Sequence, residues 1–186
     1  MSTLRRFQVP VLAALIGALG AVISMGALSS GGQAQAAPEP RLTVTRTVTI
    51  PPAAFRPTKD DWDFSNGGAG LALDSIGTAF FTAPLHFEAP VVTIRKITLF
   101  ALDNGPNSII AVLYRTTPVD GLLQNMGAVT SVGSDDSVRS FTERGLTLRR
   151  VTGAYGPFLL LQLPGSYSAG YLFHGVRVTY AYEIAP

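Results

Sequence analysis

Apolar and polar residues alternate along much of the chain after residue 40. In the clearest run, residues 42–50, Leu, Val and Ile occupy every second position and threonines stand between them, with Arg46 as the one charged interruption. Successive side chains of a β-strand point to opposite faces, so this pattern predicts a strand with one apolar and one threonine face. Arg46 is expected near an edge of the sheet. Pro51 and Pro52 should end the strand, because proline has no backbone N–H to donate.

Similar runs bring the expected total to about eight to nine strands. The further candidates are residues 78–87, 91–102, 109–114, 128–132, 141–143, 146–151, 158–163 and 176–182. Two charges meet at Arg95-Lys96, which predicts a β-bulge. The turn sequence at residues 103–106 predicts a hairpin from Val91 to Tyr114. Residues 109–114 are almost wholly apolar, which favours a central strand covered on both faces.

The spacing of these runs predicts an all-β fold. No stretch after residue 40 repeats apolar residues at helical spacing over three turns, and parallel α/β folds need crossover helices. We therefore expect a single antiparallel β-sandwich, jelly-roll-like, over residues 42–186. An immunoglobulin-like sandwich is the alternative, but the chain has no cysteine and Trp62 falls in a loop-like stretch.

The first 36 residues have the pattern of an export signal. Arg5-Arg6 precedes an uncharged apolar run at residues 11–28, and Ala34-Gln35-Ala36 fits a small-residue cleavage site. We expect a signal-peptide helix within residues 1–36, a linker at residues 37–41, and a secreted or periplasmic protein. An uncleaved membrane anchor is the alternative, since the apolar run is just long enough to span a bilayer.

Charge and cysteine content exclude several classes of function. The formal net charge is +2, and Arg5-Arg6 accounts for it, so the mature protein is expected to be neutral. A neutral chain without a basic cluster predicts no nucleic-acid partner, and membrane contact only during export. The absence of cysteine excludes disulfides, thiolate metal sites and a cysteine nucleophile.

One acidic segment has part of the pattern of a calcium loop. Asp61, Asp63 and Ser65 alternate ahead of an Asn-Gly pair, and Ca²⁺ takes several oxygen ligands from one tight turn. The twelfth position from Asp61 is Ala72, where an EF-hand has glutamate. The alternative is an exposed turn whose side chains cap their own backbone, with no cofactor.

Four aromatic residues lie in or near predicted loops: Trp62, Tyr155, Tyr167 and Tyr171. Loops on a rigid scaffold are where binding residues concentrate, and exposed rings can stack on a sugar. A carbohydrate-binding module is therefore one candidate function. Alternatively, the rings close the ends of the core, since large rings chiefly supply buried area.

The motif search favours a non-enzymatic protein. His86 and His174 are the only histidines, and the chain has neither a G-x-S-x-G elbow nor an H-E-x-x-H zinc motif. The main hypothesis is a secreted protein for surface binding or assembly. Its partner would be a cell-surface glycan or a second copy of the chain, the latter through Tyr180 and Tyr182 of the last strand.

Several segments together resemble uncharacterised secreted bacterial β-sandwich proteins of jelly-roll type, over about residues 48–182. The segments that carry this resemblance are residues 50–57, 66–71, 81–85, 91–104, 112–115 and 175–180. The resemblance implies a β-sandwich and export. It implies no catalytic or ligand-binding residue.

Overall fold

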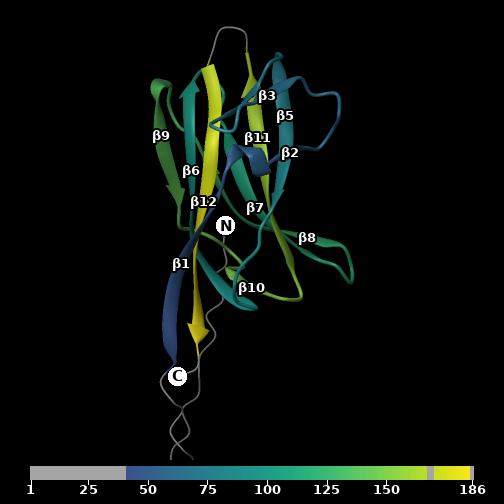
Figure 1. Ribbon diagram of the computed structural model, residues 1–186, viewed down its shortest axis with the longest axis vertical. Helices are drawn as coiled ribbons and strands as arrows, with labels where there is room; N and C mark the ends of the chain where they lie inside the picture. Colours follow the sequence, from purple (N-terminus) through teal and green to yellow (C-terminus); the bar gives the residue numbers. More distant parts are fainter. Residues whose placement is uncertain (1–40, 167–169, 185–186) are drawn as a thin grey trace, which may run out of the picture. The chain divides into compact units, whose positions relative to one another are not determined.

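Two antiparallel β-sheets face each other across a hydrophobic core and form a β-sandwich (Figure 1). The structure, a computed structural model, describes residues 41–166 and 170–184. The predicted signal peptide and all of the predicted linker except Arg41 lie outside the described residues. The strand topology confirms the predicted fold class.

Sheet A is built around the long strands β6 and β12, which pair with each other. The other side of β6 pairs with β9 and β10, and the other side of β12 pairs with β1 and β4, which in turn pairs with β3. The strands of sheet A are β1 (Leu42–Ile50), β3 (Phe64–Asn66), β4 (Leu71–Leu73), β6 (Val91–Asn104), β9 (Asp135–Glu143), β10 (Arg150–Thr152) and β12 (Gly170–Ile184).

Sheet B has the strand order β2-β5-β11-β7-β8. Its strands are β2 (Arg56–Pro57), β5 (Gly77–Pro84), β7 (Ile110–Thr117), β8 (Leu122–Thr130) and β11 (Gly156–Gly165). A single 3-10 turn, η1 (Pro52–Ala54), follows β1. Among the described residues, no helix is long and apolar enough to cross a membrane. Eight of the described strands have eight residues or more, in agreement with the prediction, and β2, β3, β4 and β10 have only two or three.

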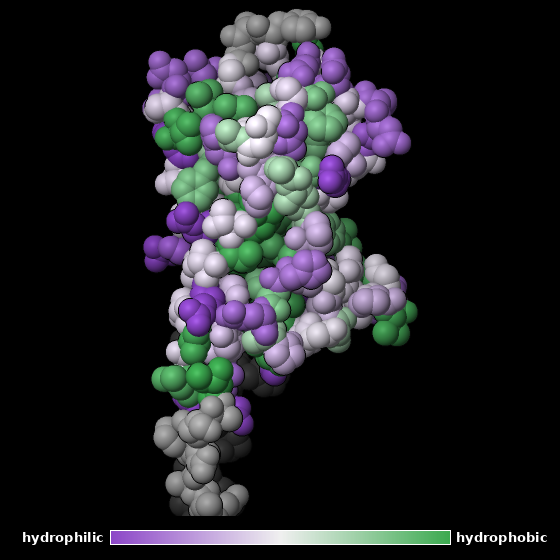
Figure 2. All heavy atoms as spheres, in the orientation of Figure 1, coloured by the Kyte–Doolittle hydropathy of each residue, from purple (hydrophilic) through white to green (hydrophobic). Residues whose placement is uncertain are grey.

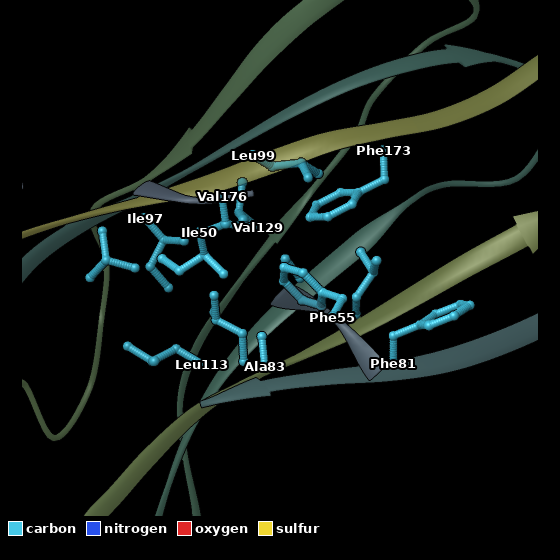
Figure 3. Close-up of a cluster of buried hydrophobic side chains, with 14 of the residues drawn as sticks. Ile50, Phe55, Phe81, Ala83, Ile97, Leu99, Leu113, Val129, Phe173 and Val176 are labelled. Carbon is cyan, nitrogen blue, oxygen red and sulfur yellow. The ribbon is translucent and has the colours of Figure 1, made fainter. Parts of the chain in front are cut away.

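The core consists of the alternate residues that each strand turns toward the opposite sheet. Those labelled in Figure 3 include Ile97, Leu99, Phe173 and Val176 from sheet A, and Phe81, Ala83, Leu113 and Val129 from sheet B. Phe55, just after η1, lies among them, with its ring 4.8 Å from that of Phe173 and edge-on to it. The alternation seen in the sequence is thus the alternation of buried and exposed positions.

Strand β1 spans the predicted residues, but only its end reaches the core. Val48 and Ile50 pack against the buried cluster, whereas Leu42 is 61% exposed. Figure 1 shows β1 and the end of β12 continuing beyond the other strands, so the start of β1 has no opposing sheet. The predicted bulge is confirmed: Ile94 pairs with Tyr180 and Lys96 with Thr179, which leaves Arg95 as the extra residue.

The predicted hairpin from Val91 to Tyr114 is wrong. β6 belongs to sheet A and β7 to sheet B, so the connection between these two strands passes from one sheet to the other. A turn sequence marks a change of direction but does not specify the partner of the next strand. The hairpin partner of β7 is β8, across a turn that Gly121 closes with a positive φ of 66° and a 2.8 Å bond from its N–H to the Thr117 carbonyl.

Strand β7 is central, between β11 and β8, but it is covered on one face only, contrary to the expectation. Ala111 and Leu113 are fully buried. Ile110, Val112 and Tyr114 alternate with them and therefore point away from the core. An apolar run alone does not distinguish a doubly covered strand from one whose outer face is also apolar.

Candidate functional site

A cleft of about 520 Å³ lies at one end of the sandwich, where the chain crosses twice between the sheets. Residues 85–90 lead from β5 to β6, and residues 153–155 lead from β10 to β11. A 3.0 Å hydrogen bond from the Leu85 N–H to the Pro157 carbonyl joins the first crossing to the start of β11. We call this the end cleft, and its lining includes His86, Phe87, Thr152, Tyr155 and Phe158.

A buried arginine supports Tyr155 at the end cleft. Arg115 lies on β7, is only 8% exposed, and has its guanidinium carbon 4.0 Å from the centre of the Tyr155 ring. Its Nε donates to Gln124 Oε1 at 2.7 Å, and its Nη1 donates to the Arg150 carbonyl at 2.5 Å. Within the described part of the chain, no carboxylate pairs with this guanidinium. Arg115 therefore ties sheet B to β10 of sheet A and holds the ring beside the cleft.

Phe87 anchors the crossing between β5 and β6 to sheet A. Its ring lies 4.8 Å from that of Tyr180 on β12. The neighbouring Glu88 accepts a 2.8 Å hydrogen bond from the Tyr182 hydroxyl and forms an ion pair with Arg46 at 3.2 Å. Burial is the main cause that raises the pKa of Tyr180, and the nearby negative charge of Glu88 is the second. This crossing is thus fixed by aromatic and ionic contacts.

Replacing Tyr180 with phenylalanine is expected to make the free energy of unfolding fall less steeply as the pH rises into the alkaline range. A raised pKa means that the folded state favours the neutral phenol. The neutral phenol therefore contributes fully to the free energy of unfolding below the unfolded pKa of about 10, and this contribution is lost as pH rises through the folded pKa. Urea denaturation of both proteins between pH 8 and pH 11.5 measures the effect. The difference in unfolding free energy should be constant up to about pH 9 and change above pH 10; parallel curves would contradict the assignment.

Phe158 joins the end cleft to the outer face of sheet B. Its ring stacks on that of Tyr114, the neighbour across β11 and β7, with centres 5.6 Å apart and planes 19° from parallel. Its side chain thus lines the cleft and also contributes to the outer face. Any ligand in the cleft would lie beside that face.

The chemistry of the end cleft is aromatic and uncharged. The lining offers the rings of Phe87, Tyr155 and Phe158, the Thr152 hydroxyl, the His86 imidazole and the backbone of two glycines. Among the described residues that line it, none is an Asp, Glu, Lys or Arg. Such a lining suits a ligand with both apolar faces and hydroxyl groups.

A second groove of about 620 Å³ has a different character. It shares Ala89 and Pro90 with the end cleft, and its lining includes Arg41, Arg95 and Arg150. Arg41 pairs with Glu183 at 3.1 Å. Neither Arg95 nor Arg150 has an acidic partner within 4 Å in the described part of the chain. We call this the arginine groove.

The structure separates the four aromatic residues that the sequence singled out. Tyr155 lines the end cleft. Trp62 packs against the core, with its Nε1 buried and without a hydrogen-bond partner. Tyr171 lies in β12, is 5% exposed, and accepts a 3.0 Å hydrogen bond from the Asn107 N–H. Tyr167 lies outside the described residues.

The proposed calcium ligands lie around a short hairpin. Asp61 and Asp63 are exposed, and the Asp63 carbonyl accepts a 2.9 Å bond from the Asp74 N–H. The Ser65 hydroxyl donates to Asp74 Oδ1 at 3.1 Å. No cluster of three or more His, Asp or Glu side chains able to hold a metal occurs among the described residues. Calcium binding by Asp61, Asp63 and Ser65 stays a prediction.

The tyrosines of the last strand, proposed as a subunit contact, face residues of their own chain. Tyr180 is 5% exposed and packs against Phe87, and the Tyr182 hydroxyl is bonded to Glu88. No pattern in the sequence indicated Arg115, Phe87 or Phe158, which shape the end cleft. The one available signal was an arginine inside an otherwise apolar strand, and its burial depends on contacts with Gln124 and β10.

No family model matches the sequence, and no curated protein matches it. Among solved structures, the CBM36-1 domain of a xylanase from the hindgut metagenome of Trinervitermes trinervoides is 13% identical with a TM-score of 0.48, covering 72% of this chain and 96% of that one. A carbohydrate-binding module CBM36 in complex with calcium and xylotriose is 12% identical, covering 74% and 99%, with a TM-score of 0.39. Eiger TNF from S. frugiperda is 11% identical, covering 79% and 96%, with a TM-score of 0.36.

Proposed function

We propose that the protein is a non-catalytic carbohydrate-binding module that holds a neutral oligosaccharide in the end cleft. The observation that carries this proposal is the lining itself, in which three aromatic rings and a hydroxyl surround about 520 Å³ without a charged carboxylate, ammonium or guanidinium. The C–H faces of a sugar stack on aromatic rings, and its hydroxyls need a few well-placed polar partners. Thr152 and His86 supply such partners.

The contacts of Tyr155 hold its ring in place before a ligand binds. Its ring rests on a guanidinium that is itself held by hydrogen bonds to Gln124 and to the carbonyls of Leu148 and Arg150, so the ring loses little conformational freedom when a ligand arrives. Binding without hydrolysis is the activity proposed, since glycoside hydrolysis commonly needs a pair of carboxyl groups at the scissile bond. Export, expected from residues 1–36, would place the module where polysaccharides are found.

Substitution of Tyr155 tests the proposal. Isothermal titration calorimetry with neutral oligosaccharides of four to six glucose, xylose or mannose units is expected to give saturable binding to at least one of them. Tyr155→Leu should weaken that binding at least tenfold, because the stacking surface is lost. His86→Ala should weaken it severalfold, because one polar partner is removed.

The matched control is the second histidine. His174 lies in β12, bonds through Nδ1 to the Ala69 carbonyl at 2.8 Å, and does not line the end cleft. His174→Gln should leave the affinity within twofold, and the melting temperature of each variant shows whether it is folded. A folded protein that binds none of these sugars contradicts the proposal, as does a preference for uronic-acid oligosaccharides, which would assign binding to the arginine groove.

A further inference from the structure

The outer face of sheet B is uncharged on all four of its long strands and carries apolar side chains on each of them. The outward side chains on β5, β7, β8 and β11 include Phe80, Thr82, Ile110, Val112, Tyr114, Thr116, Leu123, Asn125, Ala128, Thr130, Phe158, Leu160 and Gln162. None of these residues is charged. We call this surface the sheet B face.

Cross-strand pairing makes the sheet B face continuous. Leu160 on the central strand β11 pairs with Val112 on one side and Thr82 on the other. In the row on one side of Leu160, Ile110 and Phe80 flank Gln162. In the row on the other side, the ring of Phe158 stacks on that of Tyr114. Phe80 is 38% exposed. None of these apolar side chains belongs to the core or packs against it.

The outer face of sheet A shows that the chain also builds a polar surface. There, threonines of β1 and β12 lie side by side, with Thr47 and Thr179 hydroxyls 3.3 Å apart, and Arg177 lies over the ring of Phe100. Thr98 and Thr142 form a similar pair between β6 and β9. The uncharged, largely apolar surface is thus a property of the sheet B face and not of both outer faces. Large contiguous apolar patches on a protein surface mark interaction sites.

We propose that the sheet B face is the contact between two copies of this chain, packed face to face about a twofold axis. An uncharged apolar surface is complementary to itself, because pairing it with a second copy brings no like charges together. Two antiparallel sheets pack well through such faces, as sheets A and B do in the core. The strands of sheet B place one charged side chain beside this face, Arg56 of the edge strand β2, which pairs with Thr82. Within the face itself, a partner of different chemistry would find no charge to select it.

The size of the face agrees with a dimer contact. Four strands about 4.8 Å apart and about seven residues at about 3.4 Å each give a face of roughly 450 Å² in flat projection. Two such faces, with the corrugation of their side chains, approach the roughly 1,200 Å² at the lower end of specific interfaces. The β7–β8 hairpin carries further exposed apolar side chains, since Leu123 of the face is 52% and Val119 of the turn is 96% exposed, and Figure 2 shows hydrophobic side chains at its tip.

The edges of sheet B are less suited to assembly than its face. β2 has only two residues and contains Pro57, which has no N–H to donate. The outer edge of β8 is already used by its own chain, because Thr147 donates its N–H to the Met126 carbonyl at 2.8 Å. Edge-to-edge pairing of two copies is therefore less favourable at both edges than pairing through the face.

Sedimentation equilibrium of the purified processed protein tests the proposal. The expected result is twice the mass of one chain at micromolar concentration. Leu160→Lys places a charge at the centre of the face, where two copies would repel each other, and should weaken dimerisation at least a hundredfold. Thr49→Lys, at an exposed position on the outer face of sheet A, is the matched control and should leave the mass unchanged.

A charge-swap experiment distinguishes loss of the dimer contact from loss of folding in the Leu160→Lys variant. Leu160→Lys and Leu160→Glu should each be monomeric and folded by circular dichroism, and an equimolar mixture should recover the dimer. A monomeric parent protein would overturn the proposal, as would a dimer that both Leu160 variants retain. A monomer whose face instead captures an apolar surface such as a lipid vesicle would overturn it too. Sugar binding in the end cleft is measured separately, so the two proposals fail independently.

Discussion

Replacing Arg115 with methionine is expected to lower the free energy of unfolding by about 2–4 kcal/mol. Arg115 is 8% exposed and donates hydrogen bonds to Gln124 Oε1 and the Arg150 carbonyl. Methionine keeps most of the side-chain volume but donates nothing, so the part-buried hydrogen bonds to Gln124 and to the Arg150 carbonyl would both be lost. A hydrogen bond to a charged group contributes about 1.5–3 kcal/mol, and less where water can replace the lost donor. The cation–π contact with Tyr155 is lost as well.

The same substitution should also affect the end cleft. Without the guanidinium beneath it, the Tyr155 ring is free to move, so we expect weaker binding of any oligosaccharide that the parent protein binds. Urea denaturation gives the stability and calorimetry gives the affinity. Arg95→Met is the matched control, because Arg95 is exposed and has no acidic partner within 4 Å among the described residues. It should change stability by no more than about 0.5 kcal/mol. Equal effects of the two substitutions would contradict the structural role of Arg115.

Replacing Gly175 with alanine is expected to cost about 2–4 kcal/mol of stability. Gly175 has a φ of +134°, a conformation that side chains with a Cβ rarely adopt. A Cβ at this position would also lie 2.8 Å from the Ile50 carbonyl oxygen, at the end of β1. The residue lies at a register shift between β12 and β6, so the added methyl group would disturb three strands of sheet A.

Gly153→Ala is the control for this second prediction. Gly153 lies in the turn before β11, has no positive φ, and has no heavy atom within 4 Å of an added Cβ other than its chain neighbours. The substitution should be neutral or slightly stabilising, because alanine restricts the unfolded chain. The urea concentrations at the unfolding midpoints of the Gly175→Ala and Gly153→Ala proteins measure the difference in stability. A Gly175→Ala protein as stable as the Gly153→Ala protein would show that the backbone at residue 175 is not under this constraint.

Local patterns predicted the strands well and their partners poorly. The runs at residues 42–50 and 158–163 became β1 and part of β11, because alternation and β-branched residues act within a few positions of each other. The hairpin from Val91 to Tyr114 failed, because pairing depends on which distant strand buries a given face. β6 pairs with β12, which lies nearly eighty residues later in the sequence.

The candidate site shows the same division. The sequence singled out Tyr155 because an aromatic residue in a loop is a local feature, and the structure places Tyr155 at the end cleft. Its neighbours in the end cleft, Phe87 and Phe158, come from another loop and from a strand, and no pattern in the sequence links the three. Arg115 is buried only because Gln124 and the carbonyl of Arg150 are brought within hydrogen-bond distance.

The sequence by itself therefore determined the fold class, the approximate strand positions and the bulge at Arg95, and it predicts export. These follow from period-two alternation and local composition, which fix how each segment presents its two faces. Only the tertiary structure decided which apolar faces are buried: it covered the inner side of β7 and left Val112 and Leu160 outward. Burial is a property of what packs against a face, and that is set by segments far apart in the chain.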